Sequence, residues 1–165
     1  MRHCLYLTIL LLWSTGIASA QYAWLMVQHP QQTWRYGTGT IEDATIVLKP
    51  KGTHVQCDLY LQFSPRGVFS SALDSVEVRF DFTLNPAASL TDMWLWVEED
   101  IMKALILDRW TASSIYEDIV KRRRDPCLVL KEGSDYYEVK IYPLLGNDTR
   151  RIMLSSLHHS KRARV

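Results

Sequence analysis

The sequence predicts a mainly β, sandwich-like domain, and two stretches of regular alternation carry most of that prediction. Apolar and polar residues alternate from Val76 to Leu84, so one face of a strand would meet a core and the other would meet water. Residues 55–63 alternate in the same way. Turn-forming residues bound these stretches at 50–52, 64–67 and 85–86. Several short strands joined by turns are typical of two packed sheets.

The remaining strands are assigned from the same pattern. Alternation at 44–48 precedes the turn at 50–52, so this stretch and 55–63 predict a β-hairpin. Met93–Val97 is continuously apolar and predicts a strand covered on both faces. Glu98–Asp100 would form a turn, and the apolar run at 101–107 would be the hairpin partner of that strand. The last strands are expected at 127–131, 136–142 and 151–157.

One short helix is predicted among these strands, at about 113–124. Ser114 and Glu117 have the spacing of a capping box, in which each side chain bonds a free backbone N–H near the other residue. The basic residues at 121–124 would complement the negative end of the helix dipole. Asp125-Pro126 would end the helix.

Residues 1–20 have the features of a signal peptide. Arg2 supplies the positive charge, Leu5–Trp13 is a short apolar run, and Ala18-Ser19-Ala20 has the small–x–small pattern of a cleavage site. We expect cleavage between Ala20 and Gln21. The apolar run is shorter than the roughly 20 residues needed to cross a bilayer, and no later stretch is long enough. The expected location is therefore secreted, periplasmic or at the cell surface, with no membrane span after cleavage.

The rest of the chain divides into three parts. Residues 21–40 are rich in Gln, Gly, Thr and aromatic residues and predict an irregular or edge lead-in, and residues 41–157 form the β domain. Residues 158–165 are polar and basic and predict a disordered tail. Because the composition changes abruptly after Leu157, we expect a truncated or frame-shifted reading of a longer protein.

Charge and cysteine content limit the partners. Arg2 is the only charged residue before Gln21, so the mature chain would hold 18 acidic and 18 basic residues in 145. A neutral chain lacks the basic footprint that nucleic-acid binding needs. Cys57 and Cys127 could form a disulfide after export, or each could be a buried thiol within a strand. The sequence leaves both alternatives open.

Candidate catalytic and metal sites are weak, and we expect neither an enzyme nor a cofactor. Residues 98–100 are consecutive carboxylates, and consecutive residues of a strand do not converge as an acid–base pair does. His29 and His54 have no metal-ligand spacing around them. The His158-His159 pair lies in the predicted tail, and Arg122–Arg124 favours a solvated helix end over an anion site.

Two other features could matter for binding. Trp94 and Trp96 are two residues apart, so their rings would share one face of a strand. If exposed they would form a stacking platform for sugars, whereas their apolar neighbours favour core packing. Asn147-Asp148-Thr149 is a formal glycosylation sequon.

An ordered set of features runs from about Asp74 to Leu157, and its residues are Leu84, Pro86, Trp94, Trp96, Asp108, Arg109, Trp110, Ala112, Tyr116, Glu117 and Pro143. No single piece is diagnostic, but the ordered set resembles the VIT domain, the vault protein and inter-alpha-trypsin inhibitor heavy-chain type. The sequence from Asp108 to Val120 resembles the bacterial secreted branch of the family.

The resemblance implies a non-catalytic interaction module. VIT domains usually precede a von Willebrand A-type domain with an Asp-x-Ser-x-Ser metal motif, and Asp74-Ser75-Val76 does not match that motif. The implied role is adhesion, matrix association or cell-envelope assembly, with a protein or an extracellular or envelope component as partner. The alternative is a carbohydrate-binding β-sandwich of an exported enzyme. Exposed rings at Trp94 and Trp96 would favour the alternative, and buried rings would exclude it.

Overall fold

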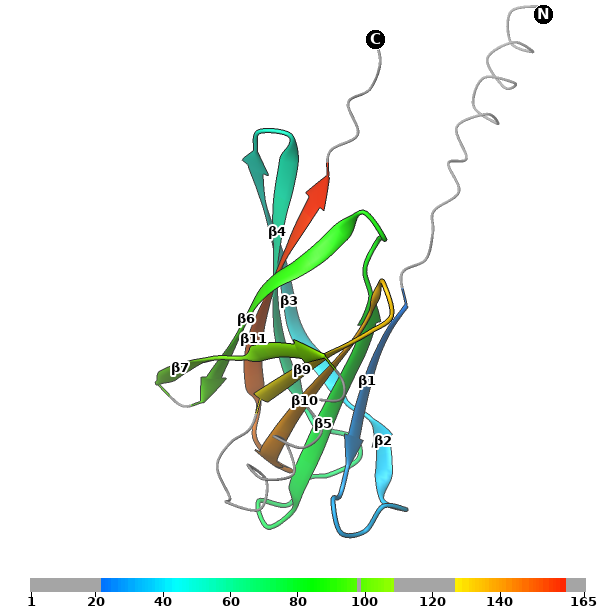
Figure 1. Cartoon of the computed structure of the whole chain (residues 1–165). Coiled ribbons are helices and arrows are strands. Elements are labelled where there is room, and N and C mark those ends of the chain that lie inside the picture. The colour runs from blue at the N-terminus through cyan, green and yellow to red at the C-terminus, as the bar shows by residue number, and fades with distance from the viewer. Residues whose placement is uncertain (1–21, 98, 109–126, 160–165) are drawn as a thin grey trace, which may run out of the picture.

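The computed structural model describes residues 22–97, 99–108 and 127–159, which form two β-sheets packed face to face (Figure 1). The prediction of a mainly β, sandwich-like fold is therefore confirmed. The predicted signal peptide at 1–20 and the predicted helix at 113–124 lie outside the described residues. The strands are β1 (Ala23–Gln28), β2 (Tyr36–Thr38), β3 (Thr40–Lys51), β4 (His54–Ser64), β5 (Ser75–Thr83), β6 (Ala88–Val97), β7 (Asp100–Lys103), β8 (Leu105–Asp108), β9 (Cys127–Glu132), β10 (Tyr136–Leu145) and β11 (Arg150–His159).

The first sheet has six strands in the order β2-β1-β5-β10-β9-β8. All neighbours are antiparallel except β8 and β9, which run parallel. Phe80 of β5 lies opposite Leu25 on one side and Val139 on the other, and all three side chains are buried. The alternation of β5 therefore continues across its neighbours and forms one apolar face.

The second sheet has five antiparallel strands in the order β3-β4-β11-β6-β7. Ile152 of β11 lies opposite Leu61 of β4 and Leu95 of β6, and all three are buried. The β3–β4 hairpin turns at Gly52, whose φ of 62° is in the left-handed region that favours glycine. The predicted hairpin is thus present.

The core lies between the two apolar faces. Phe80, Phe82 and Tyr137 stack in a row with ring centroids 5.3 and 5.4 Å apart. Burying each such side chain stabilises the fold by about 1.5–3 kcal/mol. The hydroxyl oxygen of Tyr137 accepts a bond of 3.4 Å from the backbone N–H of Leu90, so a buried polar group also joins the two sheets.

The prediction of an irregular lead-in at 21–40 was wrong for β1, which lies between β2 and β5 in the six-stranded sheet. Leu25 and Val27 of β1 point into the core, but the outward-facing Trp24 and Met26 are also bulky and apolar. The period-two signal is therefore weak. The chain passes from β2 to β3 at Gly39, where a Cβ atom would lie 3.0 Å from the side chain of Leu25.

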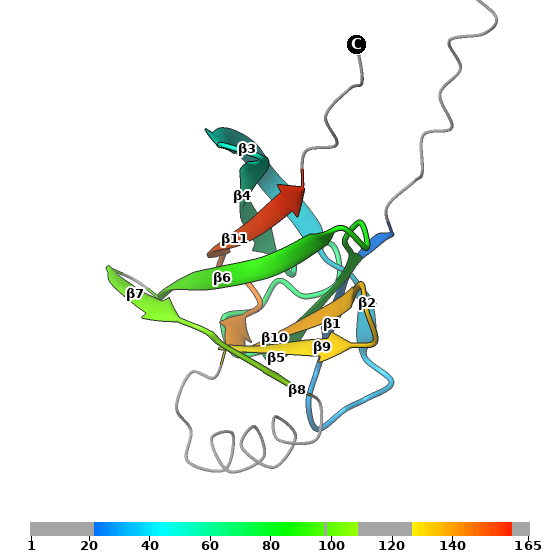
Figure 2. The ribbon, with the colours of Figure 1, turned by 45° about the horizontal axis from the view of Figure 1, so that its top comes forward.

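The apolar run at 101–107 was also misassigned as a single hairpin strand. Only β7 pairs with β6, and β8 leaves to join β9 in the other sheet. Ala104 lies at the crossing, and its N–H donates to the carbonyl of Met93. Figure 2 shows the chain passing from β7 at the edge of one sheet to β8 at the edge of the other. A continuous apolar run cannot reveal which sheet each half joins.

Two further expectations need correction. Met93–Val97 is not covered on both faces, because Met93 and Leu95 are buried whereas Trp94 and Trp96 are half-buried on the opposite face. The tail does not begin at 158, because β11 continues to His159, which lies opposite His54. Hydrogen bonding to the long β4 strand extends β11 beyond its apolar residues. Residues 160–165 lie outside the described part of the chain.

Candidate functional site

Three aromatic side chains gather on the outer face of the five-stranded sheet, the face that points away from the core. Tyr60 comes from β4, and Trp94 and Trp96 come from β6. The ring centroids of Tyr60 and Trp96 are 6.4 Å apart, and those of Trp96 and Trp94 are 6.3 Å apart. All three side chains are half-buried, so each offers part of its ring to solvent.

Arg151 lies between these rings. Its strand, β11, separates β4 from β6, and Arg151 is directly opposite Trp96. The guanidinium carbon is 4.9 Å from the centroid of Trp96 and 5.6 Å from that of Tyr60. Within the described part of the chain, Arg151 has neither a carboxylate partner nor a hydrogen bond from its guanidinium. Among the residues that the structure describes, its charge is therefore met by the faces of aromatic rings.

Met153 lies on the same outer face, between Tyr60 and Trp94. It lies opposite Tyr60 on one side and Trp94 on the other, and it is only 6% exposed. It belongs to the outer face and is separate from the core cluster between the sheets. We call Tyr60, Trp94, Trp96, Arg151 and Met153 together the aromatic surface.

A hydrogen bond fixes the indole of Trp94. Its Nε1–H donates to Oδ2 of Asp92 over 3.0 Å. The same oxygen lies 3.0 Å from the ammonium nitrogen of Lys103 on β7. One edge of the aromatic surface therefore has a defined orientation and a neighbouring pair of opposite charges.

A polar hollow of about 310 Å³ lies beside Trp96. Its lining residues are Gln62, Trp96, Asp148, Thr149, Arg150 and Arg151. Arg150 is held by Asp148 at 3.4 Å and by the carbonyl of Pro143 at 3.2 Å. The amide of Gln62 donates to the hydroxyl of Thr149 over 3.3 Å. The hollow therefore places donors and acceptors next to a ring.

A buried carboxylate stands further along the same face. Asp58 is 3% exposed and accepts hydrogen bonds from Lys49 (2.7 Å), Ser155 (2.6 Å) and Gln56 (2.8 Å). Burial opposes ionisation of Asp58, but these three donors outweigh burial and hold its pKa below the ordinary value. Every acceptor oxygen of Asp58 is thus already engaged.

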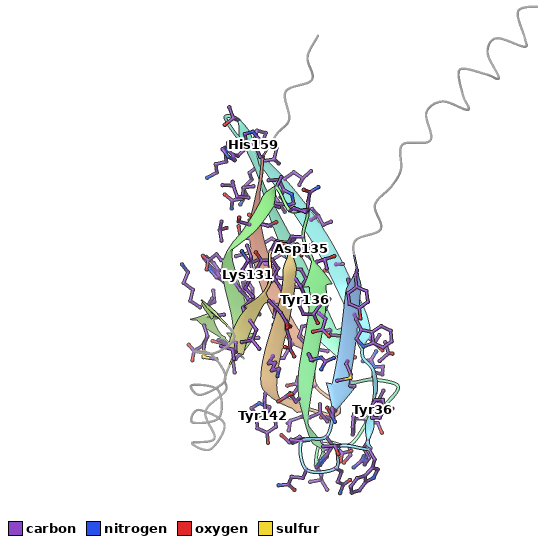
Figure 3. The ribbon with its side chains drawn as sticks, turned by 45° about the vertical axis from the view of Figure 1, so that its right-hand side comes forward. Tyr36, Lys131, Asp135, Tyr136, Tyr142 and His159 are labelled. Atoms are coloured by element: carbon purple, nitrogen blue, oxygen red, sulfur yellow. The ribbon has the colours of Figure 1, made fainter. Side chains whose placement is uncertain are left out.

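The outer face of the six-stranded sheet carries a different set of residues. Arg79 lies 3.0 Å from Asp81 and 3.7 Å from Glu138, and Lys140 lies 3.4 Å from Glu138. Tyr136, labelled in Figure 3, stands beside this group on β10. Burial, together with the charge of Asp81, raises the pKa of Tyr136 to about 12. Asp81 is 2% exposed, and its Oδ1 has no hydrogen-bond partner among the described residues.

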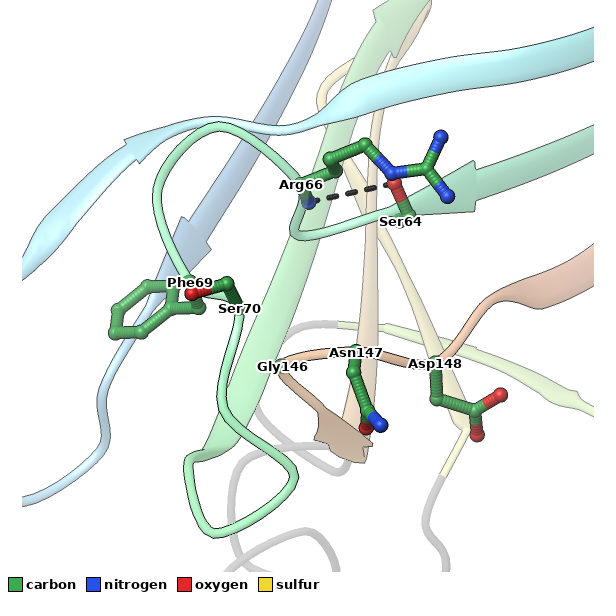
Figure 4. Close-up of a pocket in the computed structure, with 7 residues that line it drawn as sticks. All are labelled: Ser64, Arg66, Phe69, Ser70, Gly146, Asn147 and Asp148. Atoms are coloured by element: carbon green, nitrogen blue, oxygen red, sulfur yellow. Dashed lines mark hydrogen bonds between the residues drawn. The ribbon is translucent and has the colours of Figure 1, made fainter.

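Two other hollows differ from the aromatic surface. Figure 4 shows a pocket of about 210 Å³ in which the 64–70 and 146–148 segments meet. Two of its polar residues are engaged by Glu42, which does not line the pocket: Ser64 donates to Glu42 over 2.6 Å, and Arg66 pairs with Glu42 at 3.3 Å. Gly146 closes the turn, because a Cβ atom there would lie 2.5 Å from the carbonyl oxygen of Ser71.

The second hollow, of about 180 Å³, is an apolar gap between the sheets. Cys57 lines it as a free thiol, so the disulfide alternative with Cys127 does not describe this structure. Burial raises the pKa of this thiol, which disfavours the nucleophilic thiolate. Cys127 begins β9 in the other sheet.

The candidate catalytic and metal residues do not converge. Glu99 is exposed in the turn before β7, Asp100 is exposed at the first position of β7, and Glu98 lies outside the described residues. His29 accepts the backbone N–H groups of Gln31 and Gln32 within a turn. His54 and His159 touch at 3.4 Å, but no group of three metal-ligating side chains exists in the described ranges.

The search against family models matches residues 52–156 to the vault protein inter-alpha-trypsin domain. The match runs through β4 to β11 and covers more than half of the chain. The chain belongs to the VIT domain family. The resemblance noted in the sequence is thereby confirmed. No curated protein matches the chain closely enough to serve as a relative.

The VIT domain is a non-catalytic domain family of inter-alpha-trypsin inhibitor type proteins. Of the residues that carry the resemblance, Leu84 packs against the core, Pro86 is exposed in the turn after β5, and Asp108 ends β8. Pro143 follows a cis peptide bond at a β-bulge of β10. The other predicted positions, Arg109, Trp110, Ala112, Tyr116 and Glu117, lie outside the described residues.

Sequence reasoning found the two tryptophans of the VIT domain's aromatic surface and missed the rest of it. Alternation in 55–63 already placed Tyr60 on the outward face of its strand. The role of Arg151 and Met153 depends on β11 lying between β4 and β6, which no local pattern encodes.

No helix in the described part of the chain is long and apolar enough to span a membrane.

Proposed function

We propose that this chain is an exported, non-catalytic interaction module. The VIT family match over residues 52–156 carries this proposal, because it runs through β4 to β11 and the VIT domain is a non-catalytic domain family. The signal peptide pattern at residues 1–20 supports the exported part. The module would act in adhesion, matrix association or envelope assembly, as the front part of a longer VIT and von Willebrand A-type protein.

The chemistry of the described residues favours binding over turnover. The buried carboxylates Asp58 and Asp81 lie in ion pairs, and the thiol of Cys57 is held in its protonated form. The aromatic surface contains no nucleophile and no paired acid and base. Its rings, cation and adjoining hollow instead have the mixed apolar and polar character of a ligand surface.

The second candidate function is carbohydrate binding, and the partial exposure of Trp94 and Trp96 is consistent with it. Trp94 and Trp96 are half-buried on the outer face, so they are neither core residues nor a fully exposed flat platform. This intermediate exposure removes the strongest argument against sugar binding. A ligand could reach the ring edges and the part of each face that Arg151 and Met153 leave open.

Export and binding can be tested in one preparation. The gene would be expressed in a secreting host, and the extracytoplasmic product would be analysed by intact mass and N-terminal sequencing. We expect a product that begins at Gln21, and Ala18→Arg should block cleavage, because signal peptidase needs small residues near the cut. The matched control is Ser19→Arg, which changes the tolerant middle position. A product that stays in the cytosol with its first 20 residues would contradict export.

The purified product would then be sedimented with cell envelopes of the producing organism and assayed against ester, peptide and glycoside substrates. We expect retention in the envelope pellet and no turnover. Hydrolysis that persists through purification, or a chain that stays entirely in the supernatant, would contradict a non-catalytic binding role.

A further inference from the structure

We infer that the aromatic surface binds an acidic saccharide, in which a hexuronate carboxylate pairs with Arg151 and the sugar rings rest on Trp96 and Trp94. This inference rests on the proposed binding function and gives it a surface and a ligand class. It concerns the outer face of the five-stranded sheet alone.

The first argument is the charge of Arg151. In the described residues no carboxylate lies within ion-pair distance of its guanidinium, whereas its neighbour Arg150 is bound to Asp148 and to a backbone carbonyl. Contacts with Tyr60 and Trp96 engage the guanidinium through ring faces, and no acceptor for its N–H donors lies among the described residues. A planar guanidinium with free donors matches a carboxylate in a bidentate fashion.

The second argument is the shape of the surrounding surface. A pyranose has an apolar C–H face and a rim of hydroxyl groups, so it needs a ring next to hydrogen-bonding groups. Trp96 lines the hollow of about 310 Å³ together with Gln62 and Thr149, whose side chains offer both donors and acceptors. The spacings of 6.4 and 6.3 Å along Tyr60, Trp96 and Trp94 extend the apolar part over a short oligosaccharide.

The third argument is that the surface is already fixed before a ligand arrives. Met153 is buried opposite Tyr60 and Trp94, and Asp92 accepts a hydrogen bond from the indole of Trp94. Three antiparallel strands carry these residues, so little backbone freedom would be lost on binding. Preorganisation of this kind raises affinity because fewer side chains must be immobilised.

The experiment measures binding of tetragalacturonate, and of the neutral cellotetraose, to the full chain by isothermal titration calorimetry. Arg151→Gln and Trp96→Ala are compared with two controls, Arg66→Gln and Trp34→Ala. The control residues are 71% and 74% exposed, and neither belongs to the aromatic surface or lines the hollow beside Trp96. Thermal unfolding of each variant shows whether it is folded.

We expect tetragalacturonate to bind at least about tenfold more tightly than cellotetraose, because only the acidic sugar offers Arg151 a carboxylate. Arg151→Gln should remove that difference, Trp96→Ala should weaken both sugars, and the two controls should bind like the parent chain. Arg151→Lys keeps the charge without the planar fork and should restore only part of the preference. Added salt should weaken the acidic ligand more than the neutral one.

Three results would overturn the assignment. One is equal affinity for the two sugars. Another is tighter binding of a sulfated oligosaccharide of the same length, which would point to charge without carboxylate recognition. The third is a folded chain that binds no saccharide at all but is retained on cell envelopes. That last result would reject the ligand class while the proposed interaction role stands.

Discussion

The outer faces of the two sheets differ in how their charged side chains are partnered. On the six-stranded sheet, Arg79 and Lys140 sit beside Asp81 and Glu138, and the four charges pair within the face. On the five-stranded sheet, Arg151 lies against aromatic rings with no carboxylate partner among the described residues. On the first face the cations and carboxylates pair with one another, although Oδ1 of Asp81 lacks a hydrogen-bond partner among the described residues. On the second face no described carboxylate pairs with Arg151.

The difference shows that a charged side chain on the outer face of a sheet does not have the same role on both sheets. Asp81 and Glu138 are directly opposite each other, which is unfavourable unless cations lie between them. The cations of this face therefore stabilise the fold. Arg151 compensates no buried charge among the described residues, so its contribution to stability should be small and its contribution to the proposed binding large.

The largest expected effect comes from removing Arg79. Arg79→Met would leave the buried carboxylate of Asp81 without its cation, and the free energy of unfolding should fall by about 3 kcal/mol. Arg151→Met is the matched variant on the other face and should cost less than about 1 kcal/mol, the value of an exposed cation–π contact. Urea unfolding of both variants measures the contrast. Equal losses would mean that the two faces do not differ in this way.

The next effect concerns Asp58, the buried carboxylate of the five-stranded sheet. Because its folded-state pKa lies below the unfolded value, it contributes stability above about pH 4, and that stability disappears as pH falls through the folded pKa. Asp58→Asn should lower the free energy of unfolding by about 1–3 kcal/mol at neutral pH and flatten its decline in acid. Asp43→Asn, at an exposed position of β3, is the control and should preserve the decline.

A smaller effect is expected for the indole bond of the aromatic surface. Trp94→Phe keeps an aromatic ring but removes the N–H that donates to Asp92, so the free energy of unfolding should fall by about 1 kcal/mol. Trp34→Phe at an exposed loop position should change it by less. Chemical denaturation followed by circular dichroism gives both values. A larger loss for Trp34→Phe would contradict this account of Trp94.

The smallest expected effect concerns Tyr136, on the outer face of the six-stranded sheet. Its pKa is raised from 10.0 to about 12 by burial and by the charge of Asp81, so the stability that it provides is complete below pH 10 and lost as pH rises toward 12. Alkaline titration of tyrosine absorbance should show one late step that Tyr136→Phe removes. If that variant keeps the late step, another tyrosine produces it.

The strands could be predicted wherever the two faces of a strand differ in polarity. Val76–Leu84 and residues 55–63 alternate cleanly, and both are strands whose apolar residues point into the core. The prediction failed for β1, where Trp24 and Met26 make the outward face apolar as well. It also failed at 101–107, where a single apolar run serves two sheets.

The residues of the candidate site also divide into those that could be predicted from the sequence and those that could not. Trp94 and Trp96 could be placed on a common face from their spacing alone, because successive side chains of a strand point to opposite faces. Their exposure could not be predicted, because continuous apolarity is equally consistent with burial on both faces. Arg151 gave no local signal, since an arginine near the start of a strand is common on any solvated face.

By itself, the sequence determined the class of the fold, the family and the pattern of an exported chain. These depend on local alternation, on turn residues and on the order of motifs along the chain. Only the tertiary structure decided that β11 inserts between β4 and β6, and so brings Arg151 to Tyr60 and Trp96. Strand order joins residues about 90 and 55 positions apart, and no local pattern encodes such a pairing because it is selected by the packing of the whole sheet.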